Sequence, residues 1–342
     1  MKTSAYMFFI SGLTVLFFIC SVPSAFGLKT VSKNPYIGAI VMDAATGKVL
    51  VEDHADIKGY PASMVKLMNL LIILEAVEAG HISLADKVTV SARVSKIGGS
   101  QVYLKEKEVF SVDELLYAMI VQSANDAALA LALHYTGSME VFVDLMNKKA
   151  KAIGMKNTVF HSVHGLPPSK NQFPDVSTPR DMAKLCRELL KHPEALKYTS
   201  TKIRKFRPDA KEPFIMRAHN HLLKDFDGCD GFKTGYFRAG GFSIAATAKK
   251  SGARAIAVVF GSVSSKIRDK NARILLSKGL MEILTNPPPP AVKIAKKNEK
   301  ITETEYIRIP KRTFKIVVTL NVAVIMLLFA VVLFQRKKRK RY

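Results

Sequence analysis

The most constraining feature of this sequence is an apolar run near its C-terminus. Residues 314–334 form a stretch of 21 residues in which Lys315 is the one charged side chain. A helix of about 20 apolar residues crosses the ~30 Å hydrocarbon core of a bilayer. Six consecutive basic residues, Arg336 to Arg341, lie just beyond it. Because basic flanks stay in the cytoplasm, we expect a single transmembrane helix over 314–334, a basic cytoplasmic tail over 335–342, and all preceding residues on the extracytoplasmic side of the cell membrane.

The N-terminus predicts export. Lys2 is followed by a long apolar stretch, and the small residues Ala25 and Gly27 occupy the positions expected before a cleavage site. This order is typical of a secretory signal peptide, which we place at residues 1–27. The alternative is an uncleaved N-terminal helix.

The chain carries a net charge of +24 at pH 7, which favours anionic partners. An exported domain rarely meets nucleic acid, so we expect no nucleic-acid partner. Anionic membrane lipid or a wall polymer is the better candidate. A solvated basic surface without a partner explains the charge equally well.

The remaining sequence has strand patterns at both ends and helical patterns between them. An alternating hairpin pattern covers 35–53, with Ala-Thr-Gly-Lys as its turn. The predicted helices and strands that follow are a helix over 62–79, a helical region over 111–153 broken at Gly137, a helix opening at Thr178, strands from Phe232 to about 261, and a helix over 268–284. We therefore predict an α+β domain over 28–286, with an antiparallel sheet built from both chain ends and a helical subdomain between them. A linker rich in Pro and Lys covers 287–313.

Three short motifs suggest the chemistry of acyl transfer. Ser63 and Lys66 form the one Ser-x-x-Lys of the chain. Residues three apart share a helix face, so the amine reaches the hydroxyl. At a helix start, free N–H groups also favour a developing oxyanion. A neutral lysine acts as a base if burial lowers its pKa. By itself, however, the pattern is more often a plain surface helix face.

The second and third motifs supply polar groups for a substrate peptide. Ser123-Ala-Asn125 offers a hydroxyl and an amide that both donates and accepts, although Ser-x-Asn occurs elsewhere in the chain. Lys233-Thr234-Gly235 is the one such triplet. Its lysine and hydroxyl suit a carboxylate, and its glycine lets a backbone approach the strand.

In this order, the motifs are those of penicillin-binding proteins and class A β-lactamases. Over about residues 28–284 the chain resembles the low-molecular-mass penicillin-binding proteins, the serine-type D-alanyl-D-alanine carboxypeptidases of peptidase family S11. The stretches PASMVKLM, NTVFHSVHGLP, STPRDMAKL and DGFKTGYFRAGGFSIAATA add to the resemblance. It implies a β-lactamase/D,D-peptidase-like fold, removal of terminal D-alanine from peptidoglycan stem peptides ending in D-Ala-D-Ala, covalent inhibition by β-lactam antibiotics, and no cofactor.

The resemblance also implies residue roles. Ser63 would form the acyl-enzyme, Lys66 would take its proton, and Ser123 would complete the catalytic set. The residues implied to bind substrate are Asn125, Lys233, Thr234, Gly235, Tyr236 and Arg268. The backbone N–H groups of Ser63 and Tyr236 would form the oxyanion hole. Arg268 would be a second carboxylate contact, and a solvated arginine at a helix start is its alternative.

The sequence departs from many relatives after the last predicted helix. They carry a separate β-rich domain and an amphipathic anchor, whereas only about thirty residues separate Leu284 from the predicted span, too few for such a domain. Any role that the family assigns to its second domain is therefore in doubt here.

Two other functions remain open. A β-lactamase needs a carboxylate that activates water, usually in a Glu-x-x-x-Asn segment between the second and third motifs. The glutamates there are Glu140, Glu188, Glu194 and Glu212, and none has Asn four residues later. A catalytically weak wall-binding protein would keep the cleft and lose turnover. The sequence leaves open whether the enzyme prefers carboxypeptidase or endopeptidase action.

Neither histidine nor cysteine indicates a metal site. The histidines that cluster in the sequence are His161, His164, His219 and His221, and no Cys or carboxylate lies at ligand spacing from them. We expect them in loops or the core. Two cysteines, Cys186 and Cys229, remain after export, and their pairing is left open.

Overall fold

The computed structural model describes residue 28 and residues 30–169 and 172–287. The predicted signal peptide, transmembrane helix and basic tail lie outside these residues, as does almost all of the predicted linker. Within the described part, none of the helices has both the length and the apolar character that a membrane crossing requires.

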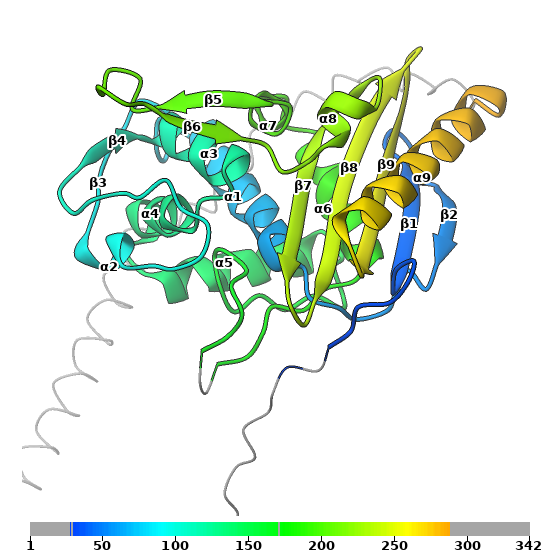
Figure 1. The fold of residues 1–342 in the computed structure, drawn as a ribbon, viewed down its shortest axis with the longest axis horizontal. Coiled ribbons are helices and arrows are strands. Elements are labelled where there is room, and N and C mark those ends of the chain that lie inside the picture. The colour runs from blue at the N-terminus through cyan, green and yellow to red at the C-terminus, as the bar shows by residue number, and fades with distance from the viewer. Residues whose placement is uncertain (1–27, 29, 170–171, 288–342) are drawn as a thin grey trace, which may run out of the picture. The chain divides into compact units, whose positions relative to one another are not determined.

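A five-stranded antiparallel sheet is built from both ends of the domain, as the sequence predicted (Figure 1). Its order is β2-β1-β9-β8-β7. The strands are β1 (Gly38–Asp43), β2 (Val49–Asp53), β7 (Cys229–Phe237), β8 (Gly241–Lys250) and β9 (Ala253–Ser262). The pairing of Ala39 with Val259 joins strands more than two hundred residues apart. Strand β7, which carries the third motif, lies at an edge of this sheet.

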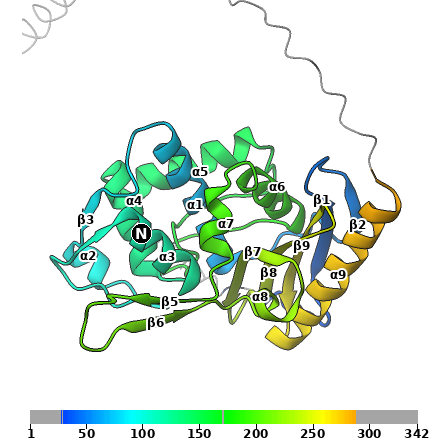
Figure 2. The ribbon, with the colours of Figure 1, turned by 90° about the horizontal axis from the view of Figure 1, so that it is seen from above.

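Both faces of the sheet are covered. Helix α9 (Ser265–Thr285) packs on one face, where Val41 of β1 and Leu276 of α9 share a cluster of buried apolar side chains (Figure 2). On the other face, Ile40 joins the main core, which includes α6 (Pro179–Leu189) and the helical lobe. Burial on both faces explains why β8 and β9 are almost continuously apolar rather than alternating.

The helical lobe is centred on α1 (Lys66–Glu78), which is buried around most of its circumference. The 3-10 turn η1 (Ala62–Val65) leads into α1, close to the predicted 62–79, and Gly80 follows at φ 71°. Around α1 lie α3 (Val112–Val121), α4 (Asn125–Thr136) and α5 (Met139–Ala152). Gly137 ends α4 at φ 72°, as predicted. The prediction of a single break in this region was wrong, because the chain also breaks between α3 and α4.

Several short elements were not predicted. Two small hairpins pair β3 (Lys87–Thr89) with β4 (Val109–Ser111) and β5 (Ile203–Phe206) with β6 (Phe214–Arg217). The remaining short helices are α2 (Ala92–Ser95), α7 (Glu194–Thr199) and α8 (Leu222–Asp225). Their three- to six-residue lengths are too short to give a clear periodic signal.

Candidate active site

The turn that carries Ser63 is held between two other segments of the chain. A side-chain carbon added to Gly165 would lie 1.9 Å from the Ala62 carbonyl oxygen, and one added to Gly235 would lie 2.3 Å from the Pro61 carbonyl oxygen. Only glycine permits these two approaches. The turn itself is tight, since Ala62 has φ 48°. This packing leaves Ser63 half-buried in η1, just before α1 and beside strand β7.

Lys66 is fully buried and points at the serine. Its Nζ atom donates hydrogen bonds to Asn125 Oδ1 at 2.7 Å and to the His164 carbonyl oxygen at 2.7 Å, and it lies 3.1 Å from Ser63 Oγ. Burial, together with the nearby charge of Lys233, holds the pKa of Lys66 well below its usual range. In the neutral amine, the two hydrogens match the two carbonyl acceptors. The lone pair then faces the Ser63 hydroxyl, which is the arrangement that a general base needs.

The second motif lies in the break between α3 and α4. Ser123 is buried and has φ 64°, an uncommon conformation for a residue other than glycine. Asn125 begins α4 and is fixed at three atoms: its N–H donates to the Ser100 carbonyl at 2.7 Å, its Nδ2 donates to the Gly98 carbonyl at 2.8 Å, and its Oδ1 accepts from Lys66. The break therefore aims the asparagine at the base.

The loop that faces Asn125, which contains Gly98 and Val102, is held in place by Asp126. Asp126 is buried, and its carboxylate accepts hydrogen bonds from the N–H groups of Val102 and Leu104. This loop also supplies the Gly98 carbonyl, so Asp126 supports the position of Asn125 indirectly.

The third motif lines the other wall of the site. Lys233 and Thr234 are buried on β7, and Lys233 Nζ donates to the Thr234 carbonyl oxygen at 3.1 Å. Burial, with the charge of Arg268, lowers the pKa of Lys233 to about 7. The Tyr236 side chain, in contrast, is exposed and stacks on Phe242 with ring centroids 4.1 Å apart.

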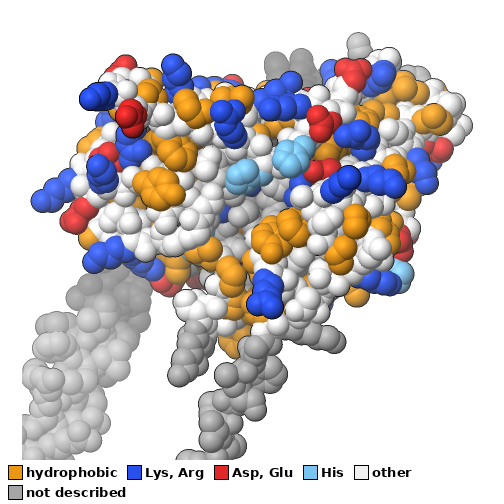
Figure 3. All heavy atoms as spheres, viewed as in Figure 1, with side chains coloured by type: hydrophobic (Ala, Val, Ile, Leu, Met, Phe, Trp, Pro, Cys, Tyr) orange, Lys and Arg blue, Asp and Glu red, His pale blue; other side chains and the backbone are white. Residues whose placement is uncertain are grey.

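Arg268 is not the solvated arginine that the sequence left open as an alternative. It is 4% exposed, and Nε donates to Asp269 Oδ1 at 2.8 Å. The other oxygen of Asp269 lies 3.0 Å from His221 Nδ1. The positive charge of Arg268 lowers the pKa of Lys233, so the two cations are close enough to repel each other. Figure 3 shows a hollow between the side chains of the helical lobe and those of the sheet, with histidine and basic side chains along its edge.

The structure thus brings the three motifs to one place. Direct hydrogen bonds join Ser63, Lys66 and Asn125, while Lys233 reaches them electrostatically. Sequence reasoning missed the backbone acceptor at His164 and the histidine at 219. Burial first, and then the charges of Lys233 and Arg268, lower the pKa of His219 to about 4, so this side chain is neutral beside the basic wall.

The four glutamates weighed as deacylating bases make other contacts. Glu140 pairs with Arg93, Glu188 with Lys191, Glu194 with Lys197, and Glu212 is exposed. The buried carboxylate Asp175 does act on the charge of Lys66. However, it accepts hydrogen bonds from the N–H groups of His161 and Ser162 and from the Ser162 hydroxyl. The part of the chain that the structure describes therefore offers no uncommitted carboxylate at the serine.

The fold and the site define a serine hydrolase of the penicillin-binding type. The sequence profile of the D-alanyl-D-alanine carboxypeptidase family, Peptidase_S11, matches residues 33–264. The chain belongs to this family.

Named relatives agree with this assignment. The chain is 37% identical over 270 residues to D-alanyl-D-alanine carboxypeptidase DacF of Bacillus subtilis, covering 78% of this chain and 68% of that protein. The crystal structure of penicillin-binding protein 5 from Haemophilus influenzae matches with a TM-score of 0.67 at 32% identity, covering 72% of this chain and 71% of that one. Penicillin-binding protein D2 from Listeria monocytogenes, in its ampicillin-bound form, matches with a TM-score of 0.64 at 31% identity, over 72% of this chain and 97% of that chain.

Proposed function

We propose that this serine carboxypeptidase removes the terminal D-alanine from peptidoglycan stem peptides ending in D-Ala-D-Ala, through an acyl-enzyme on Ser63. One observation carries the mechanism: the buried Lys66 amine gives its two hydrogens to carbonyl oxygens and turns toward Ser63 Oγ at 3.1 Å. That geometry, with a lowered Lys66 pKa, activates the serine without a histidine.

In acylation, Ser63 Oγ attacks the carbonyl carbon of the penultimate D-alanine while its proton passes to Lys66 Nζ. The backbone N–H groups of Ser63 and Tyr236 receive the oxyanion. The carbon–nitrogen bond then breaks, and the proton held by Lys66 passes through the Ser123 hydroxyl to the departing D-alanine amine. Water then attacks the ester carbonyl, gives its proton to the neutral Lys66, and releases the shortened peptide as Ser63 Oγ takes that proton back. Asn125 and the edge of β7, with Gly235, hold the peptide in an extended form, in the manner of strand addition to a sheet edge.

The basic wall binds the terminal carboxylate. Lys233 and Thr234 line it, and Arg268 adds a second positive charge. Because a bound carboxylate favours the protonated lysine, substrate binding draws a proton onto Lys233, whose pKa of about 7 leaves it only partly charged at neutral pH. The terminal carboxylate of the substrate therefore induces the full positive charge on Lys233 that binds it.

Release of D-alanine from a purified sample tests the proposal. The protein, incubated with a peptide ending in D-Ala-D-Ala, should release free D-alanine, and Ser63→Ala should abolish both release and labelling by a fluorescent penicillin while the domain still folds. Labelling without D-alanine release would instead support the catalytically weak wall-binding protein. Undiminished labelling of Ser63→Ala would overturn the assignment of the nucleophile.

A chromogenic β-lactam separates the carboxypeptidase from a β-lactamase. A penicillin's leaving group stays tethered after acylation and blocks the approach of water. No described carboxylate is uncommitted at Ser63, so we expect a burst of one equivalent followed by slow hydrolysis. Steady turnover of many equivalents would favour the β-lactamase.

We further propose that the catalytic domain lies outside the cell membrane, anchored by residues 314–334, with the tail 335–342 in the cytoplasm. The apolar stretch, its basic flank and the export pattern at 1–27 support this topology. A chain ending at Pro310 should be released in soluble form. If it remains as membrane-bound as the full chain, residues 314–334 are not the sole anchor.

A further inference from the structure

Helix α9 carries apolar side chains on both of its faces, although only its inner face packs on the sheet (Figure 2). Leu276 and Leu280 belong to the inner face and are buried there. On the outer face, Ile274 is 42% exposed, Met281 67% and Leu284 44%, and their spacing of seven and three residues places them on one side of the helix. A helix that packs by one face normally presents polar residues on the other. The stability of the fold therefore does not explain these three residues.

The same outer face carries four cations and no acid. Among the exposed residues of α9, Lys266, Lys270, Arg273 and Lys278 are basic and none is acidic. Arg273 lies 3.8 Å from Asp225 of α8. The three lysines make no carboxylate pair within the part of the chain that the structure describes, and they extend over about 18 Å of the helix. Unpaired charges in such a row give this face a positive potential.

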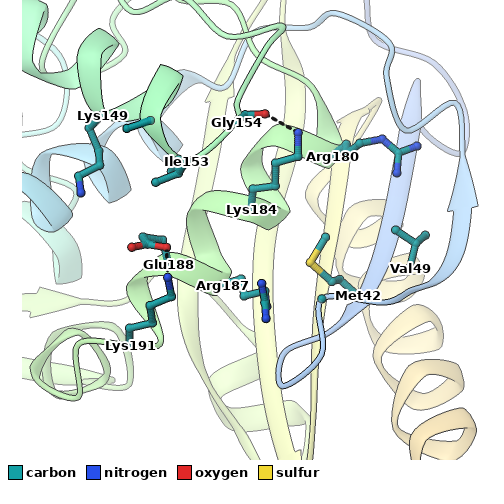
Figure 4. A pocket seen from close by; sticks show the side chains of 12 residues that line it. Met42, Val49, Lys149, Ile153, Gly154, Arg180, Lys184, Arg187, Glu188 and Lys191 are labelled. Carbon is teal, nitrogen blue, oxygen red and sulfur yellow. Dashed lines mark hydrogen bonds and ion pairs between the residues drawn. The ribbon is translucent and has the colours of Figure 1, made fainter. Parts of the chain in front are cut away.

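The other concentration of basic side chains, around a cavity of about 760 Å³ beside α6, is mostly paired within the domain (Figure 4). Lys184 pairs with Asp181 at 3.0 Å, and Lys191 pairs with Glu188 at 2.6 Å. Because these cations already have carboxylate partners, they create little free positive charge. The lysines of α9 differ from them in having no such partner among the described residues.

Apolar side chains interleaved with lysines match the surface of an anionic bilayer. At the boundary between headgroups and acyl chains, apolar groups enter hydrocarbon while cations meet phosphate. Lysine suits this boundary, because its methylene stem lies along apolar surface and its amine reaches outward. A second copy of α9 would instead bring like charges together, and an anionic polymer in water would leave Met281 exposed.

The proposed anchor keeps this face close to a bilayer. Thr285 ends α9, and 28 residues, 286–313, precede the span proposed at 314–334. A chain of that length reaches at most about 100 Å when fully extended. A tether of this kind raises the local concentration of the domain at the membrane, so a weak attraction is sufficient for contact.

We propose that the outer face of α9, from Lys266 to Leu284, docks on the anionic lipid of the membrane that anchors the chain, with the helix axis along the membrane plane. This inference rests on the proposed anchor at 314–334. Docking holds the catalytic domain in one orientation against the membrane, which sets the direction from which the active site meets its substrate.

A fluorescent label at position 281 tests the proposal on the full chain, reconstituted in lipid vesicles. Met281→Cys supplies an exposed thiol for an environment-sensitive dye, whereas the native Cys186 is buried. The wild type, treated in the same way, reports any dye on the half-buried Cys229. In vesicles with equal parts of phosphatidylglycerol and phosphatidylcholine, the emission should shift to the blue and be quenched by spin-labelled lipid. In phosphatidylcholine alone, or at high salt, both effects should largely be lost.

Two kinds of control separate the face of α9 from the rest of the domain. A label at Val141→Cys, on α5 of the helical lobe at a position 49% exposed, should not be quenched in either lipid. Equal quenching at both positions would mean that the whole domain collapses onto the lipid, and would overturn the assignment to α9.

Charge variants separate this face from the overall charge. In the Met281→Cys background, Lys270→Gln with Lys278→Gln should lower the docking equilibrium constant about 25-fold, at roughly fivefold for each lysine near an anionic surface. The matched control removes two exposed lysines from α5, Lys148→Gln with Lys151→Gln, and should keep the wild-type quenching. Equal losses in both double variants would reduce the effect to net charge and overturn the docking face. All variants should still be labelled by a fluorescent penicillin, which reports a folded domain.

Failure of docking is distinguishable from failure of the anchor. If the full chain floats with anionic vesicles while the label at 281 stays in water, the docking is overturned and the anchor stands. If the chain does not float with vesicles at all, the proposed anchor is wrong, together with the docking that rests on it. Shielding of the label in neutral vesicles that disappears on dilution of the protein would identify a second copy as the occupant and overturn the choice of lipid.

Discussion

Replacing Asn125 with aspartate tests the central claim that Lys66 acts as a neutral base. The substitution places a carboxylate where Asn125 Oδ1 now lies, 2.7 Å from Lys66 Nζ. At an effective dielectric constant of ~20, a charge pair at that separation is worth about 6 kcal/mol. This corresponds to about four pKa units in favour of the ammonium form. The shift opposes the burial that lowers the Lys66 pKa, so the pKa of Lys66 should rise in this variant.

The expected result follows from the protonation state. Each unit by which the pKa of a lysine exceeds the pH lowers its neutral fraction about tenfold. Acylation of Asn125→Asp by a fluorescent penicillin should therefore be about a thousandfold slower at pH 7. The rate should recover about tenfold for each pH unit as the pH rises toward the raised pKa of Lys66 and the neutral amine returns.

Asn125→Ala is the control, because it removes the same amide without adding charge. Both variants lose the hydrogen bond to the Gly98 carbonyl, and the aspartate also places an oxygen against that carbonyl, a cost that does not depend on pH in the alkaline range. The alanine variant should be slower than the wild type but keep the wild-type pH profile. If the slow acylation of Asn125→Asp does not recover at alkaline pH, the reasoning is refuted. Protonation of Lys66 would then not be the cause of the slow rate.

Three further outcomes are expected. Because Lys233 has a pKa of about 7, kcat/KM for a substrate with a terminal carboxylate should fall above pH 7. The variant Lys233→Arg should move that fall beyond pH 10. If the fall stays near pH 7 in the variant, another group causes it. Gly165→Ala should destabilise the domain by more than ~2 kcal/mol and stop acylation, because its new carbon meets the Ala62 carbonyl at φ 79°. Gly137→Ala, at φ 72° with nothing within 4 Å, should lower the free energy of unfolding by about 1 kcal/mol and keep acylation. Equal effects of the two glycine substitutions in thermal unfolding would remove the packing argument.

The sequence predicted the elements whose signals are local. The helix opening at Thr178 before Pro179 and the break at Gly137 are both present. Each depends on residue types that favour one backbone geometry. The antiparallel sheet built from both chain ends also followed from the order of the patterns.

The break before Asn125 could not be predicted, because it lacks a local signal. Ser123 adopts φ 64° without a glycine or proline beside it, and tertiary contacts to the Ser100 carbonyl and to Lys66 hold Asn125, two residues later. Strain of this kind is stable only where the surroundings fix it. The same reason hid the backbone acceptor at His164, since any residue type offers a carbonyl oxygen.

Arg268 shows the limit of a motif-based assignment. The resemblance located it, but its tight pairing with Asp269 is a property of the fold. The adjacent acidic residue was visible in the sequence, yet neighbours on a helix normally point apart. Only the structure shows the arginine turned back to Asp269 and the two residues buried together.

The confinement of the Ser63 turn by Gly165 and Gly235 has a consequence for the order of events during biogenesis. The turn contacts chain that is synthesised about 100 and 170 residues later. Contacts so distant in sequence form late, because loop closure precedes them. A chain that is still being synthesised or is only partly folded therefore contains Ser63 without the segments that confine its turn. We expect such a chain not to react with a penicillin. Covalent labelling by a penicillin therefore reports folding as well as activity. It shows that strand β7, which carries Gly235, has already docked against the Ser63 turn.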